Sequence, residues 1–335
     1  MKEASFYEKQ DGKLKCGLCS HRCLILESKK GICGVRQNKG GVLYSLVYGR
    51  TVAQHIDPIE KKPLYHFHPG SYAYSIATAG CNFKCKNCQN ADISQMPADH
   101  NRIIGDNVPP DRIVKLAKQY NCRSIAYTYT EPTIFYEYAY DISRLASREG
   151  IKNIFVTNGY ITEEALREIN PYLDAANIDL KSFSDKFYRS NCGARLKPVL
   201  QSIELHKELG IWIEITTLII PTLNDSEREL RRIAEFIKSV GEEIPWHVSA
   251  FYPAYKLRNI ERTPTKTLRK ARKIGLEVGL RYVYTGNILG DVGEHTYCYK
   301  CGAALIRRYG FEIMENRIKD SKCPNCGAKI DIVGI

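Results

Sequence analysis

The chain has 335 residues, and 44% of them are hydrophobic, which is enough apolar side chain to bury a large core. Lysine and arginine outnumber the acidic residues by 49 to 37, for a formal net charge of +12. No run approaches the roughly 18 apolar residues of a membrane span, and the first residues lack the apolar stretch of a signal peptide. We therefore expect a cytoplasmic protein that does not enter a membrane.

The basic residues are spread along the chain without a long block. This spread favours an ordinary solvated surface, although it leaves a nucleic-acid partner open. The cysteines are more informative, because 11 of the 13 fall into three tight clusters. Closely spaced cysteines in a cytoplasmic protein indicate metal binding more often than disulfides. We expect the other two, Cys122 and Cys192, to be small buried hydrophobic side chains.

Residues 1–69 are predicted to form an N-terminal cysteine-rich segment. It begins with a Cys-x2-Cys-x3-Cys-x9-Cys pattern made by Cys16, Cys19, Cys23 and Cys33. Four cysteines at this spacing predict a metal site; the pattern slightly favours zinc and leaves an auxiliary iron–sulfur cluster open. A hairpin is expected at 42–48, followed by a connector rich in proline and histidine at 57–70.

Residues 70–285 alternate between short apolar runs and amphipathic stretches. Strands are predicted at 71–78, 123–128, 152–157, 174–180, 211–219, 246–252 and 281–284. Helices are predicted between them, and the one at 162–169 is predicted to begin with Thr162 as its capping residue, followed by Glu163 and Glu164. This alternation predicts an α/β fold of parallel βαβ units, in which functional residues gather at the carboxyl ends of the strands.

Residues 286–335 form a separate predicted module after a glycine-rich linker. It carries two Cys-x2-Cys pairs, Cys298 with Cys301 and Cys323 with Cys326, about 20 residues apart. Paired knuckles at this separation are typical of a zinc ribbon, in which four protein ligands make the site structural. Such ribbons also serve as docking modules for nucleic acid or protein.

The central motif is Cys81-x3-Cys85-x2-Cys88, which follows the first predicted strand of the α/β region. Three thiolates on one loop can bind three irons of a [4Fe–4S] cluster and leave the fourth iron open to a small molecule. The alternative is a zinc site with a fourth ligand elsewhere. It is disfavoured because zinc sites usually pair their cysteines.

This motif at this position resembles the signature of the radical S-adenosylmethionine (SAM) superfamily, in which the open iron chelates SAM. Polar segments end the next predicted strands, at 128–132, 157–159, 177–181, 221–225 and 249–253. The resemblance extends to the first three of these segments. It implies that the cluster ligands are the catalytic residues and that SAM contacts come from Phe83, Thr130, Glu131, Asn158, Asp179, Lys181 and Tyr252. Glu131 would accept from the SAM ammonium, Asn158 would bind a ribose hydroxyl, and Lys181 would pair with the SAM carboxylate.

Further segments, at 16–36, 57–65, 80–90 and 286–287, resemble the radical SAM proteins of the AmmeMemoRadiSam system, relatives of pyruvate formate-lyase activating enzymes. This resemblance implies a partial (βα)6 barrel, a reductant such as ferredoxin or flavodoxin, and association with AMMECR-like and Memo-like proteins. One departure is Val156, which stands where those activases have an aspartate.

Three functions stay open on the sequence. The first is a glycyl-radical activase that abstracts hydrogen from a backbone glycine of a partner. The second is a radical enzyme that modifies RNA or a small molecule. The third is an iron–sulfur electron carrier without SAM chemistry.

Overall fold

The computed structural model describes all residues, 1–335, and is built around one nine-stranded sheet of order β15-β14-β13-β12-β11-β10-β8-β7-β9. Strands β8 and β10 to β15 run parallel to one another, and β7 and β9 are antiparallel additions at one edge. The sheet curves but stays open, since β15 and β9 are its two edges. The strands are β7 Arg50–Pro58, β8 Tyr72–Thr78, β9 Asp106–Asn107, β10 Ser124–Tyr127, β11 Lys152–Thr157, β12 Ala175–Asp179, β13 Trp212–Ile219, β14 Trp246–Ala250 and β15 Val283–Gly286.

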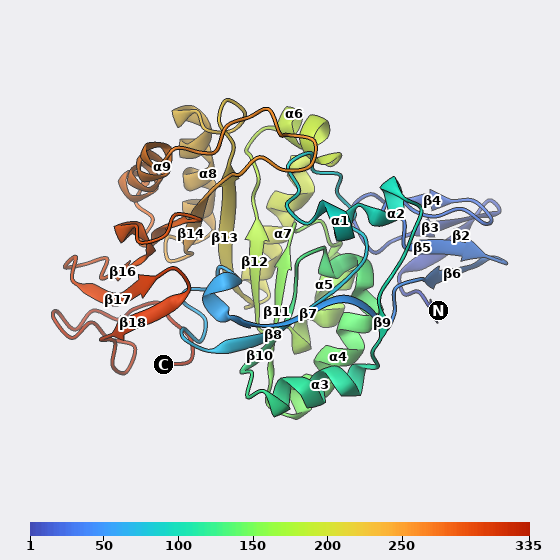
Figure 1. Cartoon of the computed structure of the whole chain (residues 1–335), viewed down its shortest axis with the longest axis horizontal. Coiled ribbons are helices and arrows are strands. Elements are labelled where there is room, and N and C mark those ends of the chain that lie inside the picture. The colour runs from blue at the N-terminus through green and yellow to red at the C-terminus, as the bar shows by residue number, and fades with distance from the viewer.

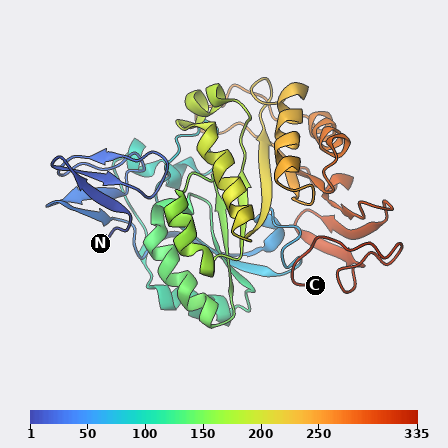
Figure 2. The same ribbon diagram turned by 180° about the vertical axis from the view of Figure 1, so that it is seen from behind.

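Helices between the parallel strands cover one face of this sheet (Figures 1 and 2). Helix α8 shows why they pack there: its buried residues Leu230, Ile233, Ala234 and Ile237 recur at helical spacing and make one apolar stripe. Ser226 caps its first turn by accepting from the backbone of Glu229. The covering helices are α3 Pro110–Gln119, α4 Tyr136–Arg148, α5 Glu163–Ile169, α7 Leu196–Glu208, α8 Glu227–Val240 and α9 Thr265–Val278.

The predicted alternation of strands and helices is confirmed in the α/β region, and its parallel strands form the predicted partial barrel. One local prediction is wrong. Thr162 precedes α5, but its side chain does not cap that helix. Its hydroxyl donates instead to the carbonyls of Gly17 and Leu18, and it therefore ties the barrel to the N-terminal segment.

Residues 50–58, which the sequence analysis groups with the N-terminal segment, pair with β8 in the main sheet. The following turn, η1 (Ile59–Lys61), is held by Asp57, whose carboxylate accepts from Lys61 at 2.8 Å and from Lys62 at 2.6 Å. The predicted connector is therefore ordered by its own charged residues. The predicted hairpin lies slightly earlier in the chain than expected, because β6 (Val42–Ser45) pairs back onto β5 (Arg36–Lys39).

Two small β-rich parts lie at opposite ends of the long axis (Figures 1 and 2). The N-terminal part holds β1 Lys2–Glu3, β2 Tyr7–Gln10, β3 Lys13–Cys16 and β4 Leu24–Ile25, together with β5 and β6. The C-terminal part is a three-stranded sheet of β16 Thr296–Tyr297, β17 Ala304–Tyr309 and β18 Glu312–Asn316. None of the helices combines the length and the apolar character that a membrane crossing needs.

Candidate functional site

The three central cysteines lie on the loop that connects β8 to the short helix α1 (Ala91–Ser94). Strand β8 is buried along almost its whole length, which fixes where the loop begins. Cys85 is buried, and Cys81 and Cys88 are half-buried. The backbone N–H of Phe83 approaches the Cys81 sulfur at 3.3 Å, and the Ser94 hydroxyl lies 3.1 Å from the Cys88 sulfur. The thiols are thus held in place by the loop itself.

A second segment braces this loop from outside. It is the π-helical turn η4 (Tyr188–Cys192), which follows α6 (Asp185–Phe187). Carbonyls of η4 accept from the cluster loop: Cys192 from Lys84 at 2.8 Å, and Asn191 from Lys86 at 3.0 Å. The Cys192 thiol is fully buried and contacts Cys85. Cys192 is therefore buried, as predicted, but it lies against the cluster loop, which the sequence analysis missed.

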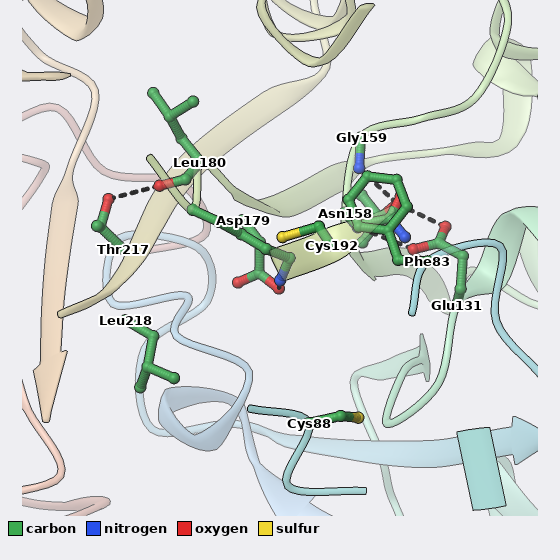
Figure 3. A network of polar contacts seen from close by, with 12 residues as sticks. Phe83, Cys88, Glu131, Asn158, Gly159, Asp179, Leu180, Cys192, Thr217 and Leu218 are labelled. Carbon is green, nitrogen blue, oxygen red and sulfur yellow. Dashed lines mark hydrogen bonds and ion pairs between the residues drawn. The ribbon is translucent and has the colours of Figure 1, made fainter. Parts of the chain in front are cut away.

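Glu131 follows β10 and is fully buried at the carboxyl edge of the sheet. One carboxylate oxygen accepts from the backbone of Thr133 at 3.0 Å and from the hydroxyls of Thr133 and Thr157 at 2.6 and 2.8 Å. The other accepts from the Asn158 backbone at 2.8 Å, beside Gly159 (Figure 3). Burial raises the pKa of this carboxyl, while these donors act to lower it. Glu131 therefore joins the ends of β10 and β11.

Asn158 extends this connection to the cluster loop. Its amide donates to the Asn82 side chain at 2.7 Å and lies 3.8 Å from the Cys81 sulfur. The Asn82 amide nitrogen is buried and has no hydrogen-bond partner. A buried donor without a partner is costly, so this nitrogen indicates a place where a bound group would accept a hydrogen bond.

Asp179 and Lys181 follow β12 and form an ion pair of 2.7 Å on the same edge of the sheet. Burial acts to lower the pKa of Lys181, but the charges of Asp179 and of the neighbouring thiols Cys85 and Cys192 outweigh it and hold that pKa well above its usual value. Lys181 is thus a charged ammonium beside the central cysteines. Such a group can bind a carboxylate.

The remaining predicted SAM contacts lie in different surroundings. The Thr130 hydroxyl donates to the Thr78 carbonyl at 2.9 Å, where β8 ends. The Phe83 ring is buried, with its centroid 5.0 Å from that of Tyr160. Tyr252 is 39% exposed, and its hydroxyl donates to the Asn287 carbonyl. Thr130 and Phe83 therefore support the cluster loop, whereas Tyr252 lies at the solvent-exposed rim.

A group that the sequence analysis missed lies next to Thr130. The Tyr129 and Lys62 side chains both donate to one oxygen of Asp57. Burial lowers the pKa of Lys62 to about 8. Tyr129 has a φ of +62°, an unusual conformation for a tyrosine that aims its ring into this group. In the sequence, the group could have been found from Asp57, because Lys61 and Lys62 follow it within one helical turn and can pair with its carboxylate.

His66 and His247 lie away from this site. His247 lies near the start of β14 and binds the buried Glu214 at 2.7 Å, at the amino end of the sheet. His66 contacts the Asp331 carbonyl and Tyr284 there. The amino ends of such strands generally carry stabilising contacts, which fits a structural role for both residues.

The C-terminal cysteines Cys298, Cys301, Cys323 and Cys326 form a separate candidate metal centre. Their sulfurs all lie within 4.8 Å of one another, and they are the only group of three or more histidine, cysteine, aspartate or glutamate residues whose ligand atoms gather in this way. The sulfur separations are 3.6 Å for Cys298–Cys326 and 3.7 Å for Cys301–Cys323. Four sulfurs at tetrahedral positions, with Zn–S bonds of about 2.3 Å, would have separations close to these. This geometry is consistent with a zinc ribbon.

Comparison with known proteins identifies the family. The model of the radical SAM superfamily matches residues 75–237, the region that holds the central cysteines and Glu131 to Lys181. The chain is also 48% identical to the uncharacterized protein MJ0808 of Methanocaldococcus jannaschii over 337 residues, covering 99% of this chain and 100% of that protein. The chain belongs to the radical SAM superfamily. It is therefore an enzyme of that class.

The chain is also similar, at lower identity, to one further curated protein and to one solved structure. The chain is 26% identical to the pyruvate formate-lyase-activating enzyme of Clostridium pasteurianum over 211 residues, covering 58% of this chain and 86% of that enzyme. Among solved structures, Streptococcus suis SuiB bound to its precursor peptide SuiA superposes with a TM-score of 0.50 at 17% identity, over 62% of this chain and 46% of that one. The SuiB similarity concerns the fold alone.

Proposed function

We propose that this radical SAM enzyme binds a [4Fe–4S] cluster through Cys81, Cys85 and Cys88 and cleaves SAM reductively. The observation that carries the proposal is the position of these thiols on one loop, next to the charged and polar ends of β10, β11 and β12. When bound, the cluster and SAM supply an electron and a 5′-deoxyadenosyl radical that abstracts hydrogen from substrate.

The residues of the site fit this cofactor. The three thiols are not gathered as tightly as the ribbon sulfurs, in keeping with ligands to three separate irons instead of one ion. The unpartnered amide of Asn82 offers a hydrogen bond beside Cys81. The Lys181 ammonium adds a positive charge beside Cys85, which favours an anionic centre.

The geometry supports distinct roles for the residues around the cluster loop. We assign Lys181, oriented by Asp179, to the SAM carboxylate, and Asn158 to a ribose hydroxyl. Glu131 was expected to accept from the SAM ammonium, but its oxygens already accept four hydrogen bonds from the protein. We therefore assign Glu131 a positioning role, in which it fixes the Asn158 backbone. Phe83, Thr130 and Tyr252 stay predictions as SAM contacts.

For the substrate, we favour a glycyl-radical activase that abstracts hydrogen from a backbone glycine of a partner polypeptide. Support comes from the similarity to the Clostridium enzyme and to a putative glycyl-radical enzyme activating enzyme of Methanocaldococcus jannaschii, 26% identical over 209 residues. AMMECR-like and Memo-like proteins are the first partners to test, and a cytoplasmic ferredoxin or flavodoxin would supply the electron. Eleven of the 13 cysteines stand at metal-binding spacings, which suits a reducing compartment.

The deciding experiment is anaerobic reconstitution with iron and sulfide, reduction with dithionite, and measurement of 5′-deoxyadenosine from SAM. Wild type should release it, and a variant with Cys81, Cys85 and Cys88 all changed to Ala should not. Release stimulated by a partner polypeptide would support the activase, whereas release stimulated only by RNA or a metabolite would favour the second function. A wild-type cluster that neither binds nor cleaves SAM would leave only an electron carrier.

The SAM carboxylate assignment has its own test. Lys181→Ala should raise the SAM dissociation constant about tenfold or more, because it removes a charge-assisted hydrogen bond from a half-buried site. Lys186→Ala, which removes an exposed lysine of the neighbouring helix α6, is the matched control. Equal constants for the two variants would remove Lys181 from the SAM site.

A further inference from the structure

The four N-terminal cysteines line one small cavity. Cys16 ends β3, Cys19 and Cys23 lie on the loop that leads to β4, and Cys33 lies between β4 and β5. All four line the cavity, and the rest of its wall is mostly apolar: Leu18, His21, Ile25, Gly31, Ile32, Arg36 and Ile134. Cys33, ten positions after Cys23, is thus folded around the same space as the other three cysteines.

Arg36 indicates the charge of whatever fills this space. Its side chain is 2% exposed, lines the cavity, and has an Nε–H without a hydrogen-bond partner. Its other nitrogens contact Glu137 at 2.9 Å and the Ser5 carbonyl at 2.5 Å. A buried guanidinium with an unpartnered donor beside four thiols suits an anionic occupant. A metal bound by four thiolates is such an occupant.

The distances between the cysteine sulfurs distinguish a single zinc ion from a [4Fe–4S] cluster. The C-terminal ribbon gathers its four sulfurs within 4.8 Å, as one tetrahedral zinc ion requires. No three of the N-terminal sulfurs are gathered so closely, and the same holds for Cys81, Cys85 and Cys88. Ligands of a [4Fe–4S] cluster bind different irons at the corners of a cube, so their sulfurs lie farther apart than zinc ligands. The N-terminal set therefore resembles the cluster loop and not the ribbon.

We propose that Cys16, Cys19, Cys23 and Cys33 bind a second [4Fe–4S] cluster. The sequence slightly favoured zinc at these positions, and the structure reverses that preference. Because all four irons would have a protein ligand, this cluster would have no open iron for SAM or substrate. A fully ligated cluster suits electron transfer.

The position of the cavity supports this role. The His21 ring nitrogen Nε2 lies 2.8 Å from the Asn82 carbonyl, next to Cys81. The Cys33 carbonyl lies 3.2 Å from where a Cβ on Gly80 would be, on the other side of Cys81. The N-terminal cysteines therefore pack directly against the cluster loop, through residues that neighbour Cys81 on both sides.

The proposal that the second cluster carries electrons rests on the proposed function. The proposal that the cavity holds a cluster does not. A low-potential ferredoxin or flavodoxin would give one electron to the second cluster and reduce it from the 2+ to the 1+ state. The second cluster would return to 2+ when it passes that electron to the cluster at Cys81, Cys85 and Cys88. No bond or proton is exchanged in this step.

The first test is a metal and sulfide count on the anaerobically reconstituted full-length protein, which needs no variant. Two clusters and one ribbon predict about eight iron, eight sulfide and one zinc per chain. About four iron and two zinc would overturn the proposal. The 5′-deoxyadenosine assay on the same sample is read separately. Four iron and two zinc with SAM cleavage would reject this inference alone, and eight iron without cleavage would reject the proposed function alone.

The second test isolates the N-terminal cluster. The Cys81, Cys85 and Cys88 triple alanine variant should keep about four iron, and dithionite should produce the electron paramagnetic resonance signal of a reduced [4Fe–4S] cluster. Adding Cys19→Ser and Cys33→Ser should remove that iron and signal, whereas adding Cys122→Ala should leave both unchanged. Zinc in place of iron in the triple variant would overturn the occupancy. Iron that dithionite cannot reduce would overturn the carrier role.

Discussion

Gly80 sets the direction in which the chain leaves β8 and enters the cluster loop. Its φ is +106°, a conformation that side chains other than glycine rarely adopt. A Cβ at this position would lie 2.8 Å from Cγ1 of Val35 and 3.2 Å from the Cys33 carbonyl. Gly80 therefore allows both the turn itself and the close approach of the N-terminal segment.

We predict that Gly80→Ala lowers thermal stability and iron content together, because the loop must shift away from Val35. The matched control is Gly150→Ala, where φ is +73° but no atom lies within 4 Å of the added Cβ. The control should lose only about 1 kcal/mol of stability and keep its iron. The thermal midpoint and the iron content of both variants check this. Equal losses would show that the approach to Val35 does not matter.

At this scale the sequence indicates which cysteines are candidate ligands, an assignment that stays a prediction, but it does not indicate the residues that support them. The spacing of Cys81, Cys85 and Cys88 is visible in the sequence because the three share one loop. The brace by Cys192 and the group of Asp57, Lys62 and Tyr129 join segments far apart in the chain. No local pattern reports such contacts, since they depend on how β7 and η4 are placed around the sheet.

Among the elements, α7 carries a buried histidine that links stability to pH. His206 is fully buried, its Nδ1 lies 2.7 Å from the Ser202 carbonyl, and its Nε2 has no partner. Burial lowers its pKa from 6.5 to about 4. The unfolded chain therefore binds a proton more readily, so the stability that the neutral form contributes is present above pH 6.5 and is lost as the pH falls toward 4.

We predict that His206→Leu reduces this acid sensitivity. At pH 5 the wild type should lose about 2 kcal/mol through His206, and the variant should not. Leucine also removes the unpartnered Nε2, so stability at pH 7.5 should be kept. Thermal midpoints at pH 7.5 and pH 5 measure the difference, with His100→Gln as a control at an exposed histidine. A variant that loses as much stability as the wild type would contradict this explanation.

Helices and strands of the α/β region were predictable because each has a strong local period. Strand β11 (Lys152–Thr157) has the bounds expected from sequence, and helix α9 (Thr265–Val278) lies between two predicted strands as expected. Strand β7 was not predicted, since its Pro58 and the following prolines suggested an irregular connector. It becomes a strand through pairing with β8, which is a tertiary effect.

At the scale of the whole molecule, the ribbon packs against the barrel through specific hydrogen bonds. Asp331 connects the two, because its side chain accepts from Arg281 at 2.9 Å and from the Tyr282 hydroxyl at 3.1 Å. Arg308 of β17 is buried and donates to the Tyr65 carbonyl at 3.0 Å. The ribbon therefore closes the amino end of the barrel, at the far end of the strands from the cluster loop.

This attachment leads to a prediction about the ribbon metal. Changing the two exposed ligands, Cys301 and Cys326, to Ser should remove one zinc per chain and leave the iron content unchanged. The thermal midpoint should fall by about 5 °C, which for a chain of this size corresponds to about 2 kcal/mol. The cause is that a ribbon without its metal cannot hold Asp331 and Arg308 against the barrel.

Zinc and iron content, together with the thermal midpoint, test this directly, and Cys122→Ala serves as the control at a cysteine outside all three clusters. If zinc is lost but the midpoint stays, the ribbon folds independently of the barrel and its contacts with Tyr65 and Tyr282 add nothing to stability. If iron is lost with the zinc, the ribbon cysteines hold part of the iron, and the division of metals between the two ends of the molecule is wrong. Zinc loss with lower stability and full iron would show that the ribbon metal stabilises the contact with the barrel and that the iron is held outside the ribbon.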